Sequence, residues 1–293
     1  MKTPTSADNI KGALFMLAGM FVFSAVDAQA KYLTQSMPPM QIVWGRQIGL
    51  FVGVLFLLGF KGTSVLHSQF PALQIVRGAA AALSATLFII GLYYVPLADA
   101  VTVTFISPIV VTILSFVILR EPVGVHRWTA TIIGFLGTLV VLRPGFERFY
   151  PGLLLPLTAA CFFAGRQVLS RYIGQTDKTQ TTVAYTAITS FLLLSLVVPF
   201  IWVPIQSQTQ MLVFVLMSLM AALGEILVIK ALEIGLAVVV SPLHYTIIIW
   251  ASFYGYILFG QLPDMWTLIG AAIIMASGLY ILHRERLRAR AKS

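Results

Sequence analysis

Residues 78–119 read GAAAALSATLFIIGLYYVPLADAVTVTFISPIVVTILSFVIL, and Asp99 is the single charged residue among them. A helix that crosses a lipid bilayer needs roughly 20 mostly apolar residues, so this stretch is long enough to cross twice. Transmembrane barrels instead show short segments of alternating hydrophobicity, and no such alternation occurs in the sequence. The stretch therefore predicts an all-α membrane protein.

The composition of the whole chain agrees with this class. Of the 293 residues, 59% are hydrophobic and 10% are charged, and the mean hydropathy is +0.93. Soluble domains carry about 25% charged residues, so a water-soluble fold is excluded. The net charge of +9 does not indicate nucleic acid as a partner, because basic residues crowd into the tail at 284–292. Such a tail fits a cytoplasmic anchor beside anionic membrane lipid.

Turns and charges divide the chain into ten apolar segments. We expect spans near residues 10–33, 40–60, 70–92, 95–119, 127–143, 151–172, 181–204, 209–233, 236–259 and 265–283. Lys and Arg residues near the ends of these spans gather on one side when the N-terminus is placed in the cytoplasm, which is the side they favour. We therefore predict a multi-pass protein of a cell membrane, with a bacterial inner membrane favoured and both termini cytoplasmic.

The two halves of the sequence resemble each other at a nearly constant offset. Lys31-Tyr32-Leu33 and Arg171-Tyr172-Ile173 lie 140 positions apart, as do the Gly12 and Gly152 segments. We place the repeats at residues 1–145 and 146–293, with five spans in each. Because five is odd, the second repeat enters the membrane from the opposite side. Inverted repeats of this kind are typical of transporters whose substrate site lies near the midplane.

The motifs give the chain a specific resemblance. They are DAQAKYL (27–33), QIVWGR (41–46), PLADAVTVTFISPIVVTILSFVILREPVG (96–124), GFLGTLVVLRPG (134–145) and FGQLPDMWTLIGAAIIMASGLYILHRER (259–286). With these motifs the sequence resembles the EamA family of the drug/metabolite transporter superfamily. The resemblance implies ten helices in two inverted five-helix repeats, a central cavity, and alternating access for small organic metabolites. One departure is Gln261, where the second repeat of the family usually has Glu; the first repeat keeps Glu121.

Ionisable side chains inside a span are costly, by about 2.5–3.5 kcal/mol on insertion scales, and are candidates for function. Asp27 and Lys31 lie four residues apart in the first span and share a helical face. Both are candidates for substrate binding, and Asp27 also for proton coupling. The alternatives are a structural ion pair, or a Lys31 that extends to the outer interface. Position 167, the counterpart of Asp27, is Gln, so we expect Asp27 to bind substrate or proton and Lys31 to keep it ionised.

The second span contributes Trp44 and Arg46 as candidates for substrate binding. They lie about 200° apart on a helix, so they cannot both face one cavity. We expect Arg46 to face the interior and Trp44 to face lipid or the interface. Arg46 would then bind a carboxylate, a phosphate or an internal acid, or form a structural pair with Asp27. The spacing of Gly45, Gly49 and Gly53 is typical of close helix packing.

The second repeat contributes the remaining candidates. Arg166 is a substrate-binding candidate, and Glu225, after a long charge-free run, is a proton-coupling candidate or a structural partner of Arg166 or Lys230. In the ninth span Pro242 leaves a backbone carbonyl without its usual donor, which predicts a broken or bent helix beside a cavity. The residues around this proline are further substrate-binding candidates: Ser241, His244 and Tyr245.

These observations favour a secondary transporter for an amino-acid-like zwitterion or an organic acid, with coupling to protons left open. A flippase for lipids or lipid-linked precursors is the alternative. An intramembrane enzyme is disfavoured, because the sequence lacks paired-histidine metal spacing and any defined catalytic triad. No phosphate-binding loop motif is present, so ATP is not the direct energy source. We expect no cofactor, and either a monomer or a homodimer.

Overall fold

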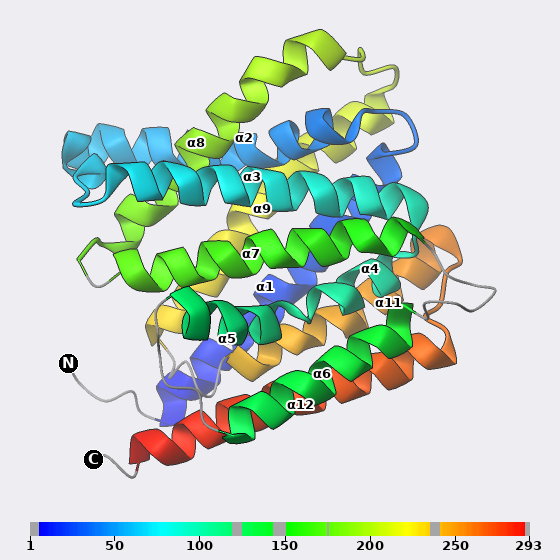
Figure 1. The fold of residues 1–293 in the computed structure, drawn as a ribbon. Coiled ribbons are helices and arrows are strands. Elements are labelled where there is room, and N and C mark those ends of the chain that lie inside the picture. The colour runs from blue at the N-terminus through cyan, green and yellow to red at the C-terminus, as the bar shows by residue number, and fades with distance from the viewer. Residues whose placement is uncertain (1–5, 119–124, 143–150, 175, 235–240, 291–293) are drawn as a thin grey trace.

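A computed structural model describes residues 6–118, 125–142, 151–174, 176–234 and 241–290. The first repeat holds α1 (Ser6–Leu33), α2 (Pro39–Lys61), η1 (Gly62–Leu66), α3 (Pro71–Tyr94), α4 (Leu97–Thr104), α5 (Ser107–Ile118) and α6 (Val125–Leu142). The second holds η2 (Pro151–Leu153), α7 (Leu154–Ile173), α8 (Thr179–Ile201), α9 (Gln208–Ile234), η3 (Ser241–Thr246), α11 (Ile247–Phe259) and α12 (Met265–Arg290). All regular structure in these ranges is helical, and the helices form one bundle (Figure 1).

The helices confirm the predicted fold class. Within the described ranges, 7 helical segments are long and apolar enough to cross a membrane by length and composition. Shorter apolar helices follow at Trp128–Val141, Leu243–Phe259 and Met265–Tyr280. Each of these segments falls on one of the predicted spans, and the chain is therefore a multi-pass membrane protein.

The fourth and ninth spans each depart from a continuous α-helix beside a Ser-Pro pair, as Pro242 predicts for the ninth. In the fourth span, α4 ends at Thr104 and α5 begins at Ser107. Pro108 has no N–H for the carbonyl four residues earlier, and the Thr104 hydroxyl donates to the Val101 carbonyl at 2.7 Å. In the ninth span, the 3₁₀ helix η3 begins at Ser241 and gives way to α11. Both breaks therefore occur at corresponding places in the two repeats.

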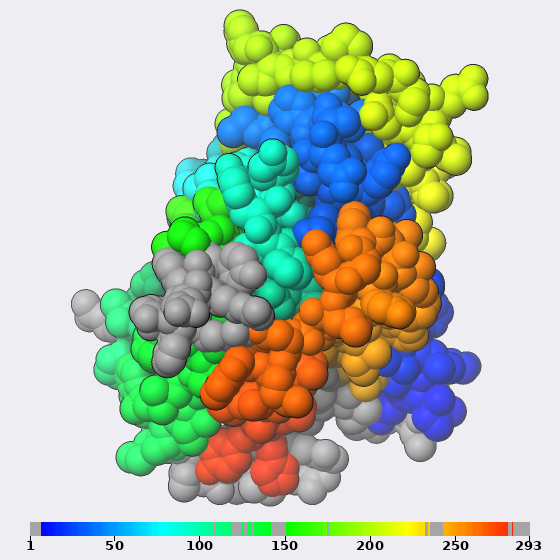
Figure 2. Space-filling model, turned by 90° about the vertical axis from the view of Figure 1, so that its right-hand side faces the viewer, coloured from blue at the N-terminus to red at the C-terminus, as the bar shows by residue number. Residues whose placement is uncertain are grey.

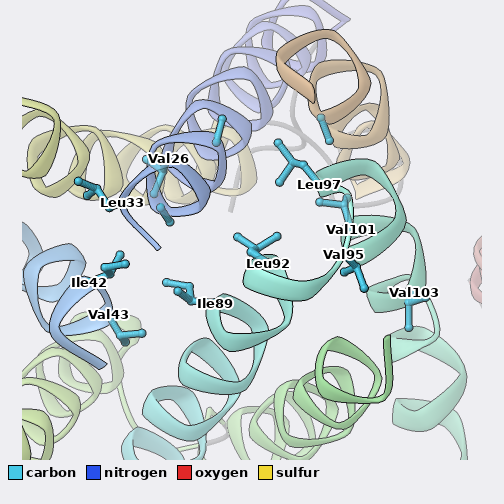
Figure 3. Packing of buried hydrophobic residues seen from close by; sticks show 14 of the residues in the cluster. Val26, Leu33, Ile42, Val43, Ile89, Leu92, Val95, Leu97, Val101 and Val103 are labelled. Carbon is cyan, nitrogen blue, oxygen red and sulfur yellow. The ribbon is translucent and has the colours of Figure 1, made fainter. Parts of the chain in front are cut away.

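The largest apolar core takes its buried side chains from both repeats, and Figure 3 shows the part that the first repeat contributes. Figure 3 shows Val26 and Leu33 of α1, Ile42 of α2, and Ile89 and Leu92 of α3 pointing toward one another. Each of these side chains is fully buried. Because lipid tails are as apolar as these side chains, close packing is what stabilises the arrangement.

The two repeats do not form separate halves of the bundle. Helix α1 of the first repeat packs along α9 of the second, and its repeat counterpart α7 packs along α3. The same exchange relates the α2–α9 contact to the α3–α8 contact, while α6 pairs with α12. Each repeat therefore completes its packing with a helix from the other.

Two glycines allow the close approach of helices at the α2–α9 and α3–α8 crossings. These crossings are equivalent in the repeat, and the two glycines lie at non-equivalent positions of it. A Cβ atom on Gly49 of α2 would collide with the backbone carbonyl of Ser218 of α9. A Cβ atom on Gly78 of α3 would lie 2.6 Å from the Cβ of Thr189 of α8. Residues 49 and 189 are 140 positions apart, and so are 78 and 218. The two crossings are thus related by the repeat symmetry. The glycine lies on the first-repeat helix in both of them, and the larger residue lies on the second-repeat helix.

Both termini lie at one end of the bundle, which we call the inner end; the opposite end is the outer end (Figure 1). At the inner end, the carboxylate of Asp177 accepts hydrogen bonds from the Ser68 hydroxyl, the Gln69 N–H at 3.1 Å and the Gln74 amide at 2.9 Å. At the outer end, the Gln41 side chain makes two hydrogen bonds with the backbone of Val203. At each end, a connection of the second repeat is therefore joined to a segment of the first repeat.

Candidate functional site

Asp27 of α1 and Arg46 of α2 form an ion pair inside the bundle. The Arg46 Nη1 donates to the Asp27 carboxylate at 3.1 Å, and the two side chains are 21% and 8% exposed. The guanidinium also lies 5.9 Å from the ring centre of Phe23. This is the arrangement in which Arg46 faces the interior and pairs with Asp27. The pair neutralises the Asp27 carboxylate, so the helix needs no contribution from Lys31 for that purpose.

Lys31 instead caps the outer end of α3. Its ammonium donates to the backbone carbonyls of Leu92 at 3.0 Å and Val95 at 2.5 Å. The chain leaves the helix here, and Pro96 has no N–H to offer the Leu92 carbonyl. The expectation that Lys31 keeps Asp27 ionised is therefore wrong in this structure, because the ammonium compensates for the donor that the proline removes.

Arg166 of α7 has a buried Nε with no hydrogen-bond partner among the described residues. Its guanidinium lies 4.7 Å from the ring centre of Phe163; Glu225 attracts it electrostatically, and Arg46 repels it. Leaving a buried donor unpaired costs about 1–3 kcal/mol, and more for a charged group. Arg166 is thus a candidate with a buried donor that is free to bind a ligand.

Glu225 of α9 is partly buried and attracts both Arg166 and Arg77 electrostatically. In the part of the chain that the structure describes, its carboxylate makes neither a hydrogen bond nor an ion pair within 4.0 Å. It therefore lies close enough to influence the two arginines without being fixed by either one.

Arg77 of α3 belongs to the same group, although its place near the end of the third span gave it no more than a part in the orientation of the chain. Its Nε donates to the Ser170 hydroxyl at 2.5 Å, and its Nη1 donates to the Thr186 hydroxyl. It is partly buried and interacts electrostatically with Arg166 and Glu225. The signal that could have revealed it is the set of hydroxyl residues at helical spacing in the seventh span, which packs against α3.

A row of hydroxyl groups on α8 supports the arginine. Thr182, Thr186 and Ser190 follow one another at intervals of four residues, so they share a helical face. Gln74 donates to the Thr182 hydroxyl at 3.1 Å, and Gln47 donates to the Ser190 hydroxyl at 3.1 Å. This row fixes Arg77 against α7 and α8.

The charged side chains together form a cluster that extends along the bundle axis; we call it the central charge cluster. Its members are Asp27, Arg46, Arg77, Arg166 and Glu225. By position along their helices, Asp27 and Arg46 lie toward the outer end, and the other three lie toward the inner end. Three arginines face two carboxylates, so the cluster has one positive charge in excess when all five are ionised.

The remaining candidates lie apart from the cluster. Trp44 donates from its indole to the Ser195 hydroxyl at 2.8 Å and stacks on Phe191, so it faces α8 and not the Asp27–Arg46 pair. Tyr245 of η3 meets Phe105 edge to face at 5.1 Å, and this contact joins the two broken spans. His244 has an exposed side chain, and the side chain of Ser241 lies outside the described residues. Among the described residues, no three His, Cys, Asp or Glu side chains are grouped to hold a metal ion.

Comparison with known proteins accounts for this architecture. A model of the EamA-like transporter family matches residues 10–143 and again residues 150–282. The chain belongs to the EamA-like transporter family. The two matches correspond to the two intertwined repeats, and they make the chain a transporter and not an enzyme.

Curated relatives of this EamA protein carry different small molecules. An S-adenosylmethionine uptake transporter of Rickettsia prowazekii is 26% identical over 277 residues, covering 94% of each chain. A riboflavin transporter of Vibrio cholerae is 30% identical over 294 residues, covering 96% of each chain. The pseudopaline exporter CntI of Pseudomonas aeruginosa is 24% identical, covering 91% of this chain and 94% of that one. A crystal structure that is 15% identical superposes with a TM-score of 0.64 over 96% of this chain and 99% of the other, which shows the shared fold.

Proposed function

We propose that this EamA protein is a secondary carrier for a small organic solute that bears a carboxylate, and that Arg166 is the residue that binds it. The observation that carries the proposal is the buried, unpartnered Nε of Arg166. A guanidinium can hold a carboxylate through two parallel hydrogen bonds, and Nε supplies one of the donors. Arg46 is already occupied by Asp27, so it contributes charge at a distance, while Arg166 supplies the contact.

The excess positive charge of the cluster supports an anionic group on the solute. An uncompensated charge inside a membrane is costly, and a bound carboxylate would offset it. Among the relatives, S-adenosylmethionine carries an amino-acid group, whereas riboflavin carries no carboxylate. The arrangement around Arg166 therefore favours a solute of the first kind, an amino acid or an amino-acid conjugate.

The packing suggests which parts move. Helices α1 and α2 both pack on α9, and α7 and α8 both pack on α3, while contacts of α2 with α8 and α3 and of α1 with α3 lie between the two groups. We infer that alternating access is a rocking of these two mixed groups, and not of one sequence repeat against the other. Asp27, Arg46 and Glu225 belong to the first group, and Arg77 and Arg166 to the second. The solute site therefore lies at the boundary that opens and closes.

Glu225 is the proton-coupling candidate that this geometry favours. As a carboxylate, it draws the first helix group toward the two arginines of the second group. Protonation would remove that attraction, and a solute carboxylate bound to Arg166 would remove it as well. The two events together would free the groups to rock, which is the requirement for coupling a proton to the solute.

Transport by purified protein in proteoliposomes tests the proposal. Amino acids, organic acids, nucleosides, vitamins and S-adenosylmethionine are offered with and without a pH gradient. Carboxylate-bearing solutes should accumulate, and Arg166→Gln should abolish their uptake, while Lys178→Gln, which changes an exposed cation, should leave it intact. Transport of uncharged solutes alone, or scrambling of lipid, would contradict the proposal.

A second experiment tests whether Glu225 couples proton movement to transport. Glu225→Gln keeps the size of the side chain and removes its titration. It should eliminate stimulation by the pH gradient while solute exchange across the membrane continues. If the pH gradient still drives uptake into vesicles that contain this variant, Glu225 is not the coupling residue.

A further inference from the structure

A cavity lies outside the central charge cluster, at the outer end of the bundle. It has a volume of about 450 Å³, and its wall comes from three segments: 31–35, 92–93 and 258–261. These segments meet on the face shown in Figure 2, where the blue, teal and orange parts of the surface come together. Lys31 is one helical turn beyond Asp27 on α1, so this cavity lies directly outside the central charge cluster.

The wall combines a cation with an unused acceptor. Lys31 is the only charged side chain among the residues that line the cavity, and two of its three N–H donors are bound to backbone carbonyls. The Gln261 Oε1 is buried with no hydrogen-bond partner among the described residues. Asp99 attracts Lys31 electrostatically from α4, but it is not part of the wall. The cavity therefore offers one donor with a positive charge and one free acceptor.

The fold places Gln261 there for a local reason. Helix α11 ends at Phe259, and Gly260 adopts a left-handed conformation with φ of 64°. The Gly260 N–H donates to the Tyr256 carbonyl at 2.9 Å and the Gln261 N–H to the Gly255 carbonyl at 3.0 Å. The first of these bonds is that of an αL cap, which turns the chain after the helix and places residue 261 in the cavity wall.

The sequence repeat shows that the neutral amide at position 261 is particular to this end. The offset of 140 that relates Lys31 to Arg171 also relates Gln261 to Glu121. At the inner end the repeat thus supplies a cation together with a carboxylate, whereas at the outer end it supplies a cation together with a neutral amide. Glu121 and the Arg171 side chain lie outside the described residues, so this comparison is one of sequence.

We propose that the outer cavity is a waiting site for the transported solute, in which Lys31 pairs with a carboxylate and the Gln261 Oε1 accepts a hydrogen bond from an adjacent amino or amide group. This site rests on the proposed function, because it binds the same class of carboxylate-bearing solute before or after Arg166 does. A neutral residue at 261 is what allows the ammonium to attract that solute.

The test measures the electrostatic potential of the cavity through the reactivity of a thiol, and it does not depend on transport. Cys161 is replaced by Ser, and Gln35→Cys places a thiol at an exposed position in the cavity wall. Its rate of reaction with an anionic methanethiosulfonate that carries a sulfonate is compared with its rate for the trimethylammonium analogue. Gln206→Cys, an exposed outer-end position outside the wall, gives the reference ratio.

The anionic reagent should be favoured at residue 35 relative to residue 206. Gln261→Glu places a carboxylate beside Lys31 and should reduce this preference about tenfold, the size expected for one added charge a few ångströms away at a protein surface. Gln206→Glu is the matched control, since it makes the same chemical change at the same end, and it should leave the ratio at residue 35 unchanged. Acetate should protect the residue 35 thiol from reaction, and its uncharged isostere acetamide should not.

Equal reagent ratios at residues 35 and 206, an unchanged ratio in Gln261→Glu, or equal effects of acetate and acetamide would each overturn the waiting site. These results are independent of the solute screen, so the proposed carrier function and the waiting site can fail separately. If a carboxylate solute is transported, Gln261→Glu should also raise KM for entry from the outer face about tenfold with kcat retained. Entry from the inner face should keep its KM.

Discussion

Arg46 of α2 donates to the carboxylate of Asp27 of α1 at 3.1 Å. Asp27 has Lys31 one turn away on its own helix, yet the ion pair forms with the residue on the neighbouring helix. Four-residue spacing makes a contact geometrically available, but competing partners decide whether it forms. Here the free carbonyls at the end of α3 take Lys31, and Asp27 is left to Arg46.

This pair gives the first prediction. Asp27→Asn leaves the Arg46 charge without its partner and should lower the free energy of unfolding by about 3 kcal/mol, as expected for a broken, largely buried pair. Asp27→Asn combined with Arg46→Gln removes both charges and should be more stable than the single variant. Thermal unfolding in detergent compares the stability of the native protein, the single variant and the double variant. A double variant that is less stable than Asp27→Asn would show that Arg46 is stabilised by something other than Asp27.

Lys31→Met removes the donors that satisfy the Leu92 and Val95 carbonyls. Hydrogen bonds to charged groups contribute about 1.5–3 kcal/mol each, so a loss of roughly 3 kcal/mol in unfolding free energy is expected. Hydrogen exchange should accelerate at the end of α3 and the start of α4, which localises the effect. Lys178→Met is the control, because that side chain is exposed at the inner end. Unaltered exchange around Leu92 would exclude the capping role.

Gly49→Ala should destabilise the α2–α9 crossing. The added methyl group meets the backbone carbonyl of Ser218, which cannot rotate away as a side chain could. Overpacking of this kind costs about 1–3 kcal/mol. Gly53→Ala lies one turn further on α2, where no atom lies within 4 Å of the new Cβ, and it should be neutral or slightly stabilising. The prediction fails if thermal unfolding does not separate the two variants.

The inner-end carboxyl of Asp177 predicts a pH dependence. Burial opposes its ionisation, but hydrogen bonds from Ser68, Gln74 and the Gln69 N–H outweigh burial and hold its pKa below the ordinary value. A carboxyl group with a depressed pKa stabilises the fold above its unfolded pKa, about 3.9, and this stabilisation is lost as pH falls through the folded pKa. The melting temperature of the native protein should therefore decline more steeply below about pH 4 than that of Asp177→Asn. Parallel curves for the two proteins would contradict this prediction.

Much of the fold could be predicted from the sequence because the bilayer imposes one strong constraint. A chain in lipid must satisfy its backbone groups internally, so apolar length alone predicts helices and their number. The breaks in the fourth and ninth spans were also predictable, since Pro108 and Pro242 each remove a backbone donor. The exchange of helices between the repeats was not predictable, because hydropathy records which segments are apolar and not which ones touch.

The candidate site was predictable only in part. Arg46 and Asp27 were expected inside the bundle, and their pairing was one of the alternatives. Arg77 was missed, because a cation near the end of a span has the same sequence signal whether it extends to the surface or turns inward. The role of Lys31 was missed because its acceptors are backbone carbonyls, which every residue possesses and no motif marks.

The exchange of α3 and α9 between the repeats also sets an order for biogenesis. The face of α3 that packs on α7 and α8 has no partner until the second repeat has been synthesised and inserted. The first five spans can therefore enter the membrane, but they cannot reach their final packing while the ribosome is still making α7, α8 and α9. Each repeat needs helices of the other for its final packing. A chain that stops at the boundary between the repeats is therefore an incomplete structure and not a smaller transporter.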